Sequence, residues 1–179
     1  MNYGLIGSSL RTQPTVKRKV FVSYHHGGDQ SYYEVFSTAF SDTYDVISDN
    51  SLERAIDSDD LEYAMRSIRE NFISGSSCTI VLVGKFTWGR KYVDWEIEAT
   101  LDKQHGLIGV QLPTLQAGPN GTVTVPDRLH DNIVSGYALW LTWAQFTSGA
   151  QACTGYIEQA NGRAKMLIVN NRDRRQRNA

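Results

Sequence analysis

Apolar and polar residues along this chain fall into segments whose period changes between that of a strand and that of a helix. Lys19 to Tyr24, KVFVSY, is a β-branched and aromatic run that predicts a strand, and a turn-rich segment from His25 to Asp29 follows it. Ser31, with Glu34 three residues later, is a capping box that predicts a helix start. The expected buried face of this helix consists of Tyr32, Val35, Phe36, Ala39 and Phe40.

The same order of strand and helix repeats further along the chain. Tyr44 to Ile47 predicts a second strand, and Ser48 to Asp60 is a polar, acidic loop whose last two residues can cap a helix. That helix ends before Gly75, and its expected buried face consists of Leu61, Ala64, Met65, Ile68 and Phe72. Thr79 to Val83, TIVLV, then predicts a third strand that is covered on both faces.

A third helix and a fourth strand come next. From Arg90 the period is helical, and Val93, Ile97 and Leu101 recur at i, i+4 and i+8 as a buried stripe. Leu107 to Leu112, LIGVQL, predicts a fourth buried strand.

Beyond Pro113 the pattern weakens. Residues 114–131 are rich in Gly, Pro, Asn and Thr, which indicates a long loop or a short hairpin. Tyr137 to Trp143 resembles a further strand, and one or two helices are expected up to about Val169. The basic residues from Asn170 on are expected to form a frayed, solvated terminus rather than an arm that binds nucleic acid.

The alternation of strands and helices predicts an α/β fold with a central, mostly parallel sheet. Right-handed crossovers make a flavodoxin-like three-layer sandwich the simplest topology. A chain of 179 residues needs only one domain, which we place at residues 19–169. Residues 1–18 are expected to form a flexible extension, and residues 170–179 a basic tail.

Composition excludes several partners. A net charge of -1 with 21% charged residues, and no basic stripe with interleaved aromatics, argues against nucleic acid and against a membrane surface. Cys78 and Cys153 do not belong to a metal-ligand spacing, so no metal is expected. The N-terminus does not resemble a signal peptide, and the chain contains no run of about 18 apolar residues. We therefore expect a cytoplasmic protein.

Sequence motifs of other enzymes on similar folds are missing. The chain contains no GxGxxG after the first strand, no GxxxxGK[ST] and no GxSxG. A phosphate-receiving domain needs acidic residues after the first strand and an aspartate after the third, where this chain has Tyr24, His25 and His26, and Gly84 and Lys85. His25 and His26 are adjacent, so they cannot both face one metal from the same side of a strand.

One carboxylate remains as the candidate for chemistry. Glu96 lies on the helix after the third strand, about 60° from Val93 at 100° per residue, so it borders the buried stripe. Ligands of open α/β sheets bind in the crevice beyond the carboxyl ends of the strands. The alternative interpretation is an ordinary surface glutamate that the helix dipole favours in the first turns.

A carboxylate in an aromatic-lined crevice suits cleavage of a nucleoside's glycosidic bond. Positive charge develops on the ribose as the base leaves, and a fixed carboxylate stabilises that charge. A cationic nicotinamide leaves without protonation, so a single glutamate is sufficient.

The sequence resembles the TIR-like proteins, in particular the bacterial branch that includes the TIR component of the Thoeris antiphage defence system. TIR domains begin with a strand ending in Val-Phe-(Leu/Ile)-Ser-(Phe/Tyr), which Val20, Phe21, Val22, Ser23 and Tyr24 match here. They also carry a tryptophan-x-x-x-glutamate motif on the helix after the third strand. Tyr92, Val93, Asp94, Trp95 and Glu96 match that motif, with Tyr92 in place of the tryptophan. The similarity covers residues 19–112.

The resemblance implies a flavodoxin-like enzyme that cleaves NAD, its substrate rather than a cofactor, with Glu96 as the catalytic residue. Released nicotinamide and a free, cyclic or conjugated ADP-ribose would be the products, and a downstream effector protein would sense the nucleotide. The resemblance also implies self-association. The implied substrate-binding residues are Ser23, Tyr24, His25 and His26 after the first strand, Asp49 and Asn50 over the pocket, and Trp88, Tyr92 and Trp95, which could stack on a ring.

Two alternatives stay open at this point. One is a TIR-like adaptor that turns over nothing, and the other is a nucleoside deoxyribosyltransferase, which also uses a glutamate in a similar sheet. The loop after the second strand lacks the Arg-Asp and Pro-Gly features of animal and plant TIR domains and has Asp49, Asn50, Ser51 and Leu52 instead. Residues 113–169 match no motif.

Overall fold

A five-stranded sheet forms the centre of the molecule in the computed structural model, which describes residues 17–48 and 61–179. The strands are β1 (Arg18–Ser23), β2 (Tyr44–Ser48), β3 (Cys78–Val83), β4 (Gly106–Gln111) and β5 (Leu139–Thr142). Their order is β2-β1-β3-β4-β5, and all four pairings are parallel. This is the flavodoxin-like winding, so the predicted fold class is confirmed and places the carboxyl ends of all five strands at one edge.

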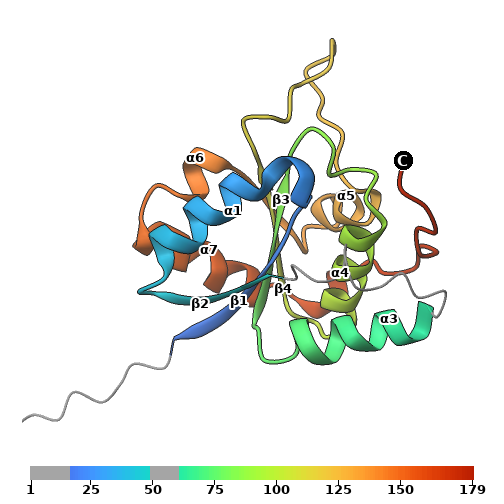
Figure 1. Ribbon diagram of the computed structural model, residues 1–179, viewed down its shortest axis with the longest axis horizontal. Coiled ribbons are helices and arrows are strands. Elements are labelled where there is room, and N and C mark those ends of the chain that lie inside the picture. The colour runs from blue at the N-terminus through green and yellow to red at the C-terminus, as the bar shows by residue number, and fades with distance from the viewer. Residues whose placement is uncertain (1–16, 49–60) are drawn as a thin grey trace, which may run out of the picture.

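Helices cover both faces of the sheet (Figure 1). The elements are α1 (His26–Phe40), α3 (Leu61–Ser67), the π-helical η1 (Ile68–Ile73), α4 (Lys91–Asp102), α5 (Asp127–Val134), α6 (Trp143–Phe146), α7 (Ala150–Asn161) and the 3₁₀ turn η2 (Lys165–Leu167). Helices α1, α6 and α7 lie on one face, and α3, α4 and α5 lie on the other. No helix in the described part of the chain is long and apolar enough to span a bilayer.

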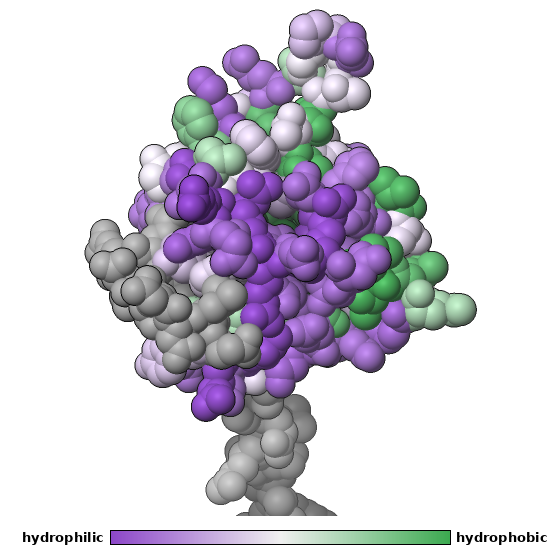
Figure 2. Space-filling view, turned by 90° about the vertical axis from the view of Figure 1, so that its right-hand side faces the viewer, coloured by the Kyte–Doolittle hydropathy of each residue, from purple (hydrophilic) through white to green (hydrophobic). Residues whose placement is uncertain are grey.

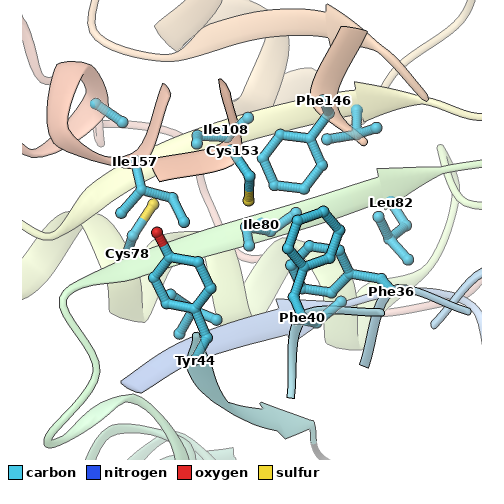
Figure 3. Close-up of a cluster of buried hydrophobic side chains, with 14 of the residues drawn as sticks. Phe36, Phe40, Tyr44, Cys78, Ile80, Leu82, Ile108, Phe146, Cys153 and Ile157 are labelled. Atoms are coloured by element: carbon cyan, nitrogen blue, oxygen red, sulfur yellow. The ribbon is translucent and has the colours of Figure 1, made fainter. Parts of the chain in front are cut away.

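The core follows the two-residue period of the strands. All of β3 is buried; Ile80 and Leu82 pack toward α1 and α7, whereas Val81 and Val83 pack toward α4 and α5. Figure 3 shows the first of these layers, where Phe36 and Phe146 stack with their ring centroids 5.3 Å apart. Burial of each such side chain stabilises the fold by roughly 1.5–3 kcal/mol. Both faces of the sheet therefore supply core, as the run TIVLV predicts.

Helix α1 begins earlier than its sequence pattern predicts. The amide groups of Gly28 and Asp29 both donate to the carbonyl oxygen of His25, so the expected turn is the first turn of the helix and Ser31 is not its cap. Phe36 is buried as expected, but Val35 is 57% exposed. The capping-box prediction is wrong because Ser31 lies inside the helix, five residues after its first residue, His26. Asp29, in the first turn, provides the negative charge that a helix N-terminus favours.

The second half of the chain contains two further differences. The loop expected to extend to Asp131 ends at Pro126, where helix α5 begins, and residues 113–126 project beyond the carboxyl ends of the strands (Figure 1). Residues 170–179 do not fray into solvent, because their backbone and side chains hydrogen-bond to α4. The expectation of a frayed terminus is therefore wrong, although residues 171–173 and 176–179 are exposed. The strand at 139–142 and the helices after it agree with the sequence pattern.

Candidate functional site

Glu96 lies at the carboxyl edge of the sheet, on the helix that packs against β3. Helix α4 runs antiparallel to β3, and a 2.7 Å hydrogen bond between the hydroxyls of Thr100 and Thr79 fixes their relative level. Glu96 is one turn nearer the helix N-terminus, about 6 Å along the axis, which corresponds to about two strand residues. It is therefore level with Val81, which is aligned with Ser23 of β1.

Ser23 lies on the same face of the sheet as α4. Phe21, two residues earlier, packs in the cluster that contains Trp95 and Ala99 of α4, and side chains two apart share a strand face. Ser23 is 1% exposed and Glu96 is 5% exposed. The β1 tip and the Glu96 helix thus face one buried layer.

The hydroxyl of Ser23 makes no hydrogen bond to any residue in ranges 17–48 and 61–179. A buried hydroxyl without a partner costs about 1–3 kcal/mol. A ligand hydroxyl placed here would satisfy that group, so Ser23 can contact a substrate directly as well as end the strand.

A buried network that the sequence did not reveal joins the tips of β1 and β3. The hydroxyl of Thr87 donates to the carboxylate of Asp29 at 2.9 Å and accepts the amide N–H of Gly84 at 2.9 Å. Burial raises the pKa of Asp29, and the Thr87 hydrogen bond and the charge of nearby His25 partly oppose this rise. The first turn of α1 is thereby held against the loop that leads into α4.

Gly84 has no room for a side chain in this network. A Cβ atom there would lie 2.0 Å from Oδ1 of Asp29. We expect Gly84→Ala to destabilise the protein by about 1–3 kcal/mol, as overpacking of a rigid site does. Urea unfolding measures this, and Gly155→Ala in α7 is the control, because nothing lies within 4 Å of that Cβ position. An unchanged unfolding midpoint for Gly84→Ala would show that the Asp29 side chain can move away without loss of stability.

The side chains of the two histidines have different neighbours. His25 precedes α1, and its ring packs over Gly27 and close to Asp29. His26 instead lies 4.3 Å from the ring of Tyr24. The two adjacent side chains therefore have different surroundings.

Tyr24 itself points away from the Glu96 layer. It is 5% exposed in the core beneath α1, stacks on Tyr33 and donates a 2.7 Å hydrogen bond to Gln30. Of the residues predicted after the first strand, Ser23 lies on the α4 face of the sheet, His25 lies near Asp29, and Tyr24 and His26 contact each other.

The three aromatic residues near Glu96 lie close to the C-terminal residues. The indole N–H of Trp95 donates to the carbonyl oxygen of Arg175 at 2.9 Å, and Tyr92 packs edge-on against Trp95. Trp88 is 38% exposed, and the Arg175 guanidinium lies 5.8 Å from its ring centroid. Trp88 also lines a small cleft with Lys85, Leu115, Gln116 and Thr124. Of the three, it is the one with an accessible ring face.

Asp49 and Asn50 fall outside the described residues. They follow Ser48, which is aligned with Val22 of β1 at the same edge of the sheet. Within the described ranges, no group of three or more His, Cys, Asp and Glu side chains is arranged to hold a metal ion.

A further buried charge pair was also missed from the sequence. Arg128 is fully buried, and its guanidinium bonds the carboxylate of Asp94 on α4 at 3.0 Å. It was missed because residues 114–131 were expected to form a loop or a short hairpin. The available signal was the helical spacing of Leu129 and Ile133, four residues apart, directly after the basic residue Arg128.

Comparison with known proteins places this arrangement in a family. Among solved structures, the chain is similar to one described as the activated Roq1 resistosome directly recognizing the pathogen effector XopQ (TIR domains), with 14% identity and a TM-score of 0.38. That match covers 54% of this chain, which spans only 58% of the other. No curated protein matches the chain. The family model described as Thoeris protein ThsB, TIR-like domain, matches residues 21–117, more than half of the chain, including both Ser23 and Glu96. The chain therefore belongs to the ThsB TIR-like family.

Proposed function

We propose that this protein cleaves NAD at the bond between nicotinamide and ribose, with Glu96 as the catalytic residue. The observation that carries the proposal is the position of the Glu96 carboxylate group. This carboxylate lies at the carboxyl edge of a parallel sheet, level with Ser23. This edge is where open α/β sheets bind nucleotides. The chain that carries the carboxylate belongs to a family of TIR-like proteins.

The reaction requires little from the protein beyond positioning and charge. The glycosidic C–N bond breaks, its electron pair leaves with nicotinamide, and the cationic base becomes neutral. Positive charge passes to the ribosyl group, where the ionised Glu96 stabilises it and orients the ribose hydroxyls. A water or a hydroxyl of the substrate then attacks the ribosyl carbon and loses its proton.

Ser23 and His25 are proposed to hold the substrate at the β1 tip. The buried hydroxyl of Ser23 lies in the same layer as Glu96, and His25 lies near Asp29 at the start of α1. Trp88 lies in the loop before α4, and its exposed ring can stack on a base. Asp49 and Asn50 follow β2 at this edge and remain proposed contacts, as do Tyr24, His26, Tyr92 and Trp95.

The biological role follows from the family. Membership in the ThsB TIR-like family supports a part in antiphage defence signalling. We propose that an ADP-ribose-derived nucleotide, linear or cyclic, is the signal that a separate effector protein detects in the cytoplasm.

Product analysis distinguishes the proposal from its two alternatives. Purified protein is incubated with NAD, or with a deoxynucleoside and a second base, and the products are separated and weighed by mass spectrometry. We expect nicotinamide and an ADP-ribose species from NAD. Base exchange on the deoxynucleoside alone would indicate a deoxyribosyltransferase, and no product from either substrate would indicate an adaptor.

The different surroundings of the two histidines predict different effects of their removal. We expect His25→Ala to raise KM for NAD by roughly tenfold, the effect of losing one hydrogen bond of about 1–1.5 kcal/mol. His26→Ala should raise KM less, because its ring packs on Tyr24. Steady-state kinetics measures both. Equal, wild-type KM values would remove His25 from the site.

A further inference from the structure

The last ten residues of the chain follow the whole length of the helix that carries Glu96. We call residues 170–179 the C-terminal segment. Asn170 donates to Asp102 at the end of α4, and the carboxylate of Asp94, in its first turn, accepts the Arg175 backbone N–H at 3.0 Å. Side-chain oxygen Oδ1 of Asn178 accepts the N–H of Lys91, the first residue of α4, at 2.9 Å. Both ends of the helix are therefore held.

Opposite charges line the two surfaces in contact. Arg174 donates through Nε to both carboxylate oxygens of Glu98 on α4, at 2.9 and 3.0 Å. From α5, Asp127 accepts a hydrogen bond from Arg175 at 3.2 Å, and Asp131 accepts from Arg172 at 2.9 Å. The face of the molecule seen in Figure 2 is correspondingly hydrophilic at its centre.

These contacts are partly shielded from water. Glu98 is 12% and Arg174 21% exposed in their side chains, so their attraction is less screened than that of an open surface pair. The hydrogen bond from Arg172 lowers the pKa of Asp131, because it stabilises the charged form of the carboxyl group.

The buried Arg128 joins the segment to both helices. From α5 it donates to Asp94 of α4, to the Asn170 side chain at 2.6 Å and to the carbonyl oxygen of Arg172 at 3.1 Å. One guanidinium thus satisfies a helix carboxylate and the backbone of the segment at the same time. Movement of the segment would leave part of this buried cation without acceptors.

The segment contacts the side of α4 that faces away from the proposed substrate layer. Asp94 and Glu98 lie two residues before and after Glu96, so each is about 160° from it around the helix. At these two carboxylates the segment lies opposite Glu96, and Arg175 also reaches the ring of Trp88. The contacts of the segment set the rotation and the position of the helix, and Trp95, held through its indole N–H, adds to that restraint.

We propose that the C-terminal segment is a positioning element for catalysis: by clamping the far side of α4, it holds the Glu96 carboxylate at the ribose, with Arg174 as the main positioning residue. This inference rests on the proposed function for its catalytic consequence. The clamp itself is a property of the fold and can be measured without substrate. It lies in the part of the chain beyond the matched residues 21–117.

The test compares Arg174→Glu and Arg174→Lys with wild type in the full chain. Arg174→Glu places two carboxylates together and should release the segment, whereas lysine keeps the charge. Arg18→Glu is the matched control, because Arg18 pairs with Glu158 of α7, on the other face of the sheet. Nicotinamide release gives kcat and KM, hydrogen exchange reports on the α4 amides, and thermal unfolding reports on global stability.

We expect Arg174→Glu to lower kcat by about 10- to 100-fold, the cost of a misplaced catalytic group, with KM within about twofold. Exchange of the amides of residues 94–102 should become roughly tenfold faster while the unfolding transition stays cooperative. Arg174→Lys should stay within about threefold of wild type, and Arg18→Glu should match it.

Faster exchange with an unchanged kcat would overturn the positioning role, and unchanged exchange would overturn the clamp. If wild type releases no nicotinamide at all, the proposed function fails. In that case the exchange rates of the α4 amides alone decide whether the clamp exists.

Discussion

Glu96→Gln is expected to lower the rate of nicotinamide release by about 100-fold or more while the protein stays folded. Glutamine keeps the size and hydrogen-bonding capacity of the side chain but lacks the charge that opposes the developing ribosyl cation. Loss of one such preorganised group lowers kcat and leaves KM nearly unchanged, because the ground state carries the positive charge on the base. Steady-state kinetics and a thermal unfolding curve measure the two parts of this result.

The control for this variant must be chosen from the structure. Glu98 lies on the far side of α4 and is the obvious choice from the sequence, but its carboxylate pairs with Arg174, so its removal disturbs the helix. Glu70, exposed on η1, is a better match, and Glu70→Gln should behave like wild type. Activity of Glu96→Gln within a few-fold of wild type would remove Glu96 from the mechanism.

Arg128→Met is expected to have the largest effect on stability. The Arg128 side chain is 1% exposed, and its loss leaves the Asp94 carboxylate, 10% exposed, without its strongest partner. Breaking a buried ion pair by removing one partner typically costs about 3–5 kcal/mol. Urea unfolding should therefore show a clearly lower midpoint, with residues 170–179 exchanging amide hydrogens fastest because they lose a donor at the carbonyl of Arg172.

A second substitution separates lost charge pairing from lost packing. Adding Asp94→Asn to Arg128→Met removes the unpaired charge, so the double variant should be more stable than the sum of the two single changes by about 0.5–3 kcal/mol. If the effects of the two substitutions on the free energy of unfolding are additive, the charge pairing contributes little to stability beyond the packing of the two side chains. A loss below about 1 kcal/mol for Arg128→Met alone would contradict the importance assigned to this residue.

The sheet and the Glu96 helix could be predicted because their signals are local. The run TIVLV contains only apolar and β-branched residues, so its burial on both faces can be predicted without knowing which elements pack on it. The 3.6-residue period of Val93, Ile97 and Leu101 fixes the buried side of α4. Once the strand order is known, Glu96 must lie at the carboxyl edge. The placement of the candidate carboxylate therefore needed only the sequence and the winding rules.

Other features depend on contacts between distant residues. Asp29 lies in the first turn of α1, and its carboxylate accepts a buried hydrogen bond from Thr87, more than fifty positions later, so the local capping box at Ser31 was misleading. The C-terminal residues carry no apolar period, and their order comes from arginines that pair with carboxylates on two helices. Charge complementarity of this kind has no fixed spacing in a sequence.

The most direct test of the account is a structure of the Glu96→Gln variant with NAD bound. We expect the ribose next to nicotinamide to lie within hydrogen-bond reach, about 2.6–3.2 Å, of the residue 96 side chain and of the Ser23 hydroxyl. A dinucleotide bound with that ribose elsewhere, for instance wholly within the cleft beside Trp88, would contradict the proposed role of Glu96.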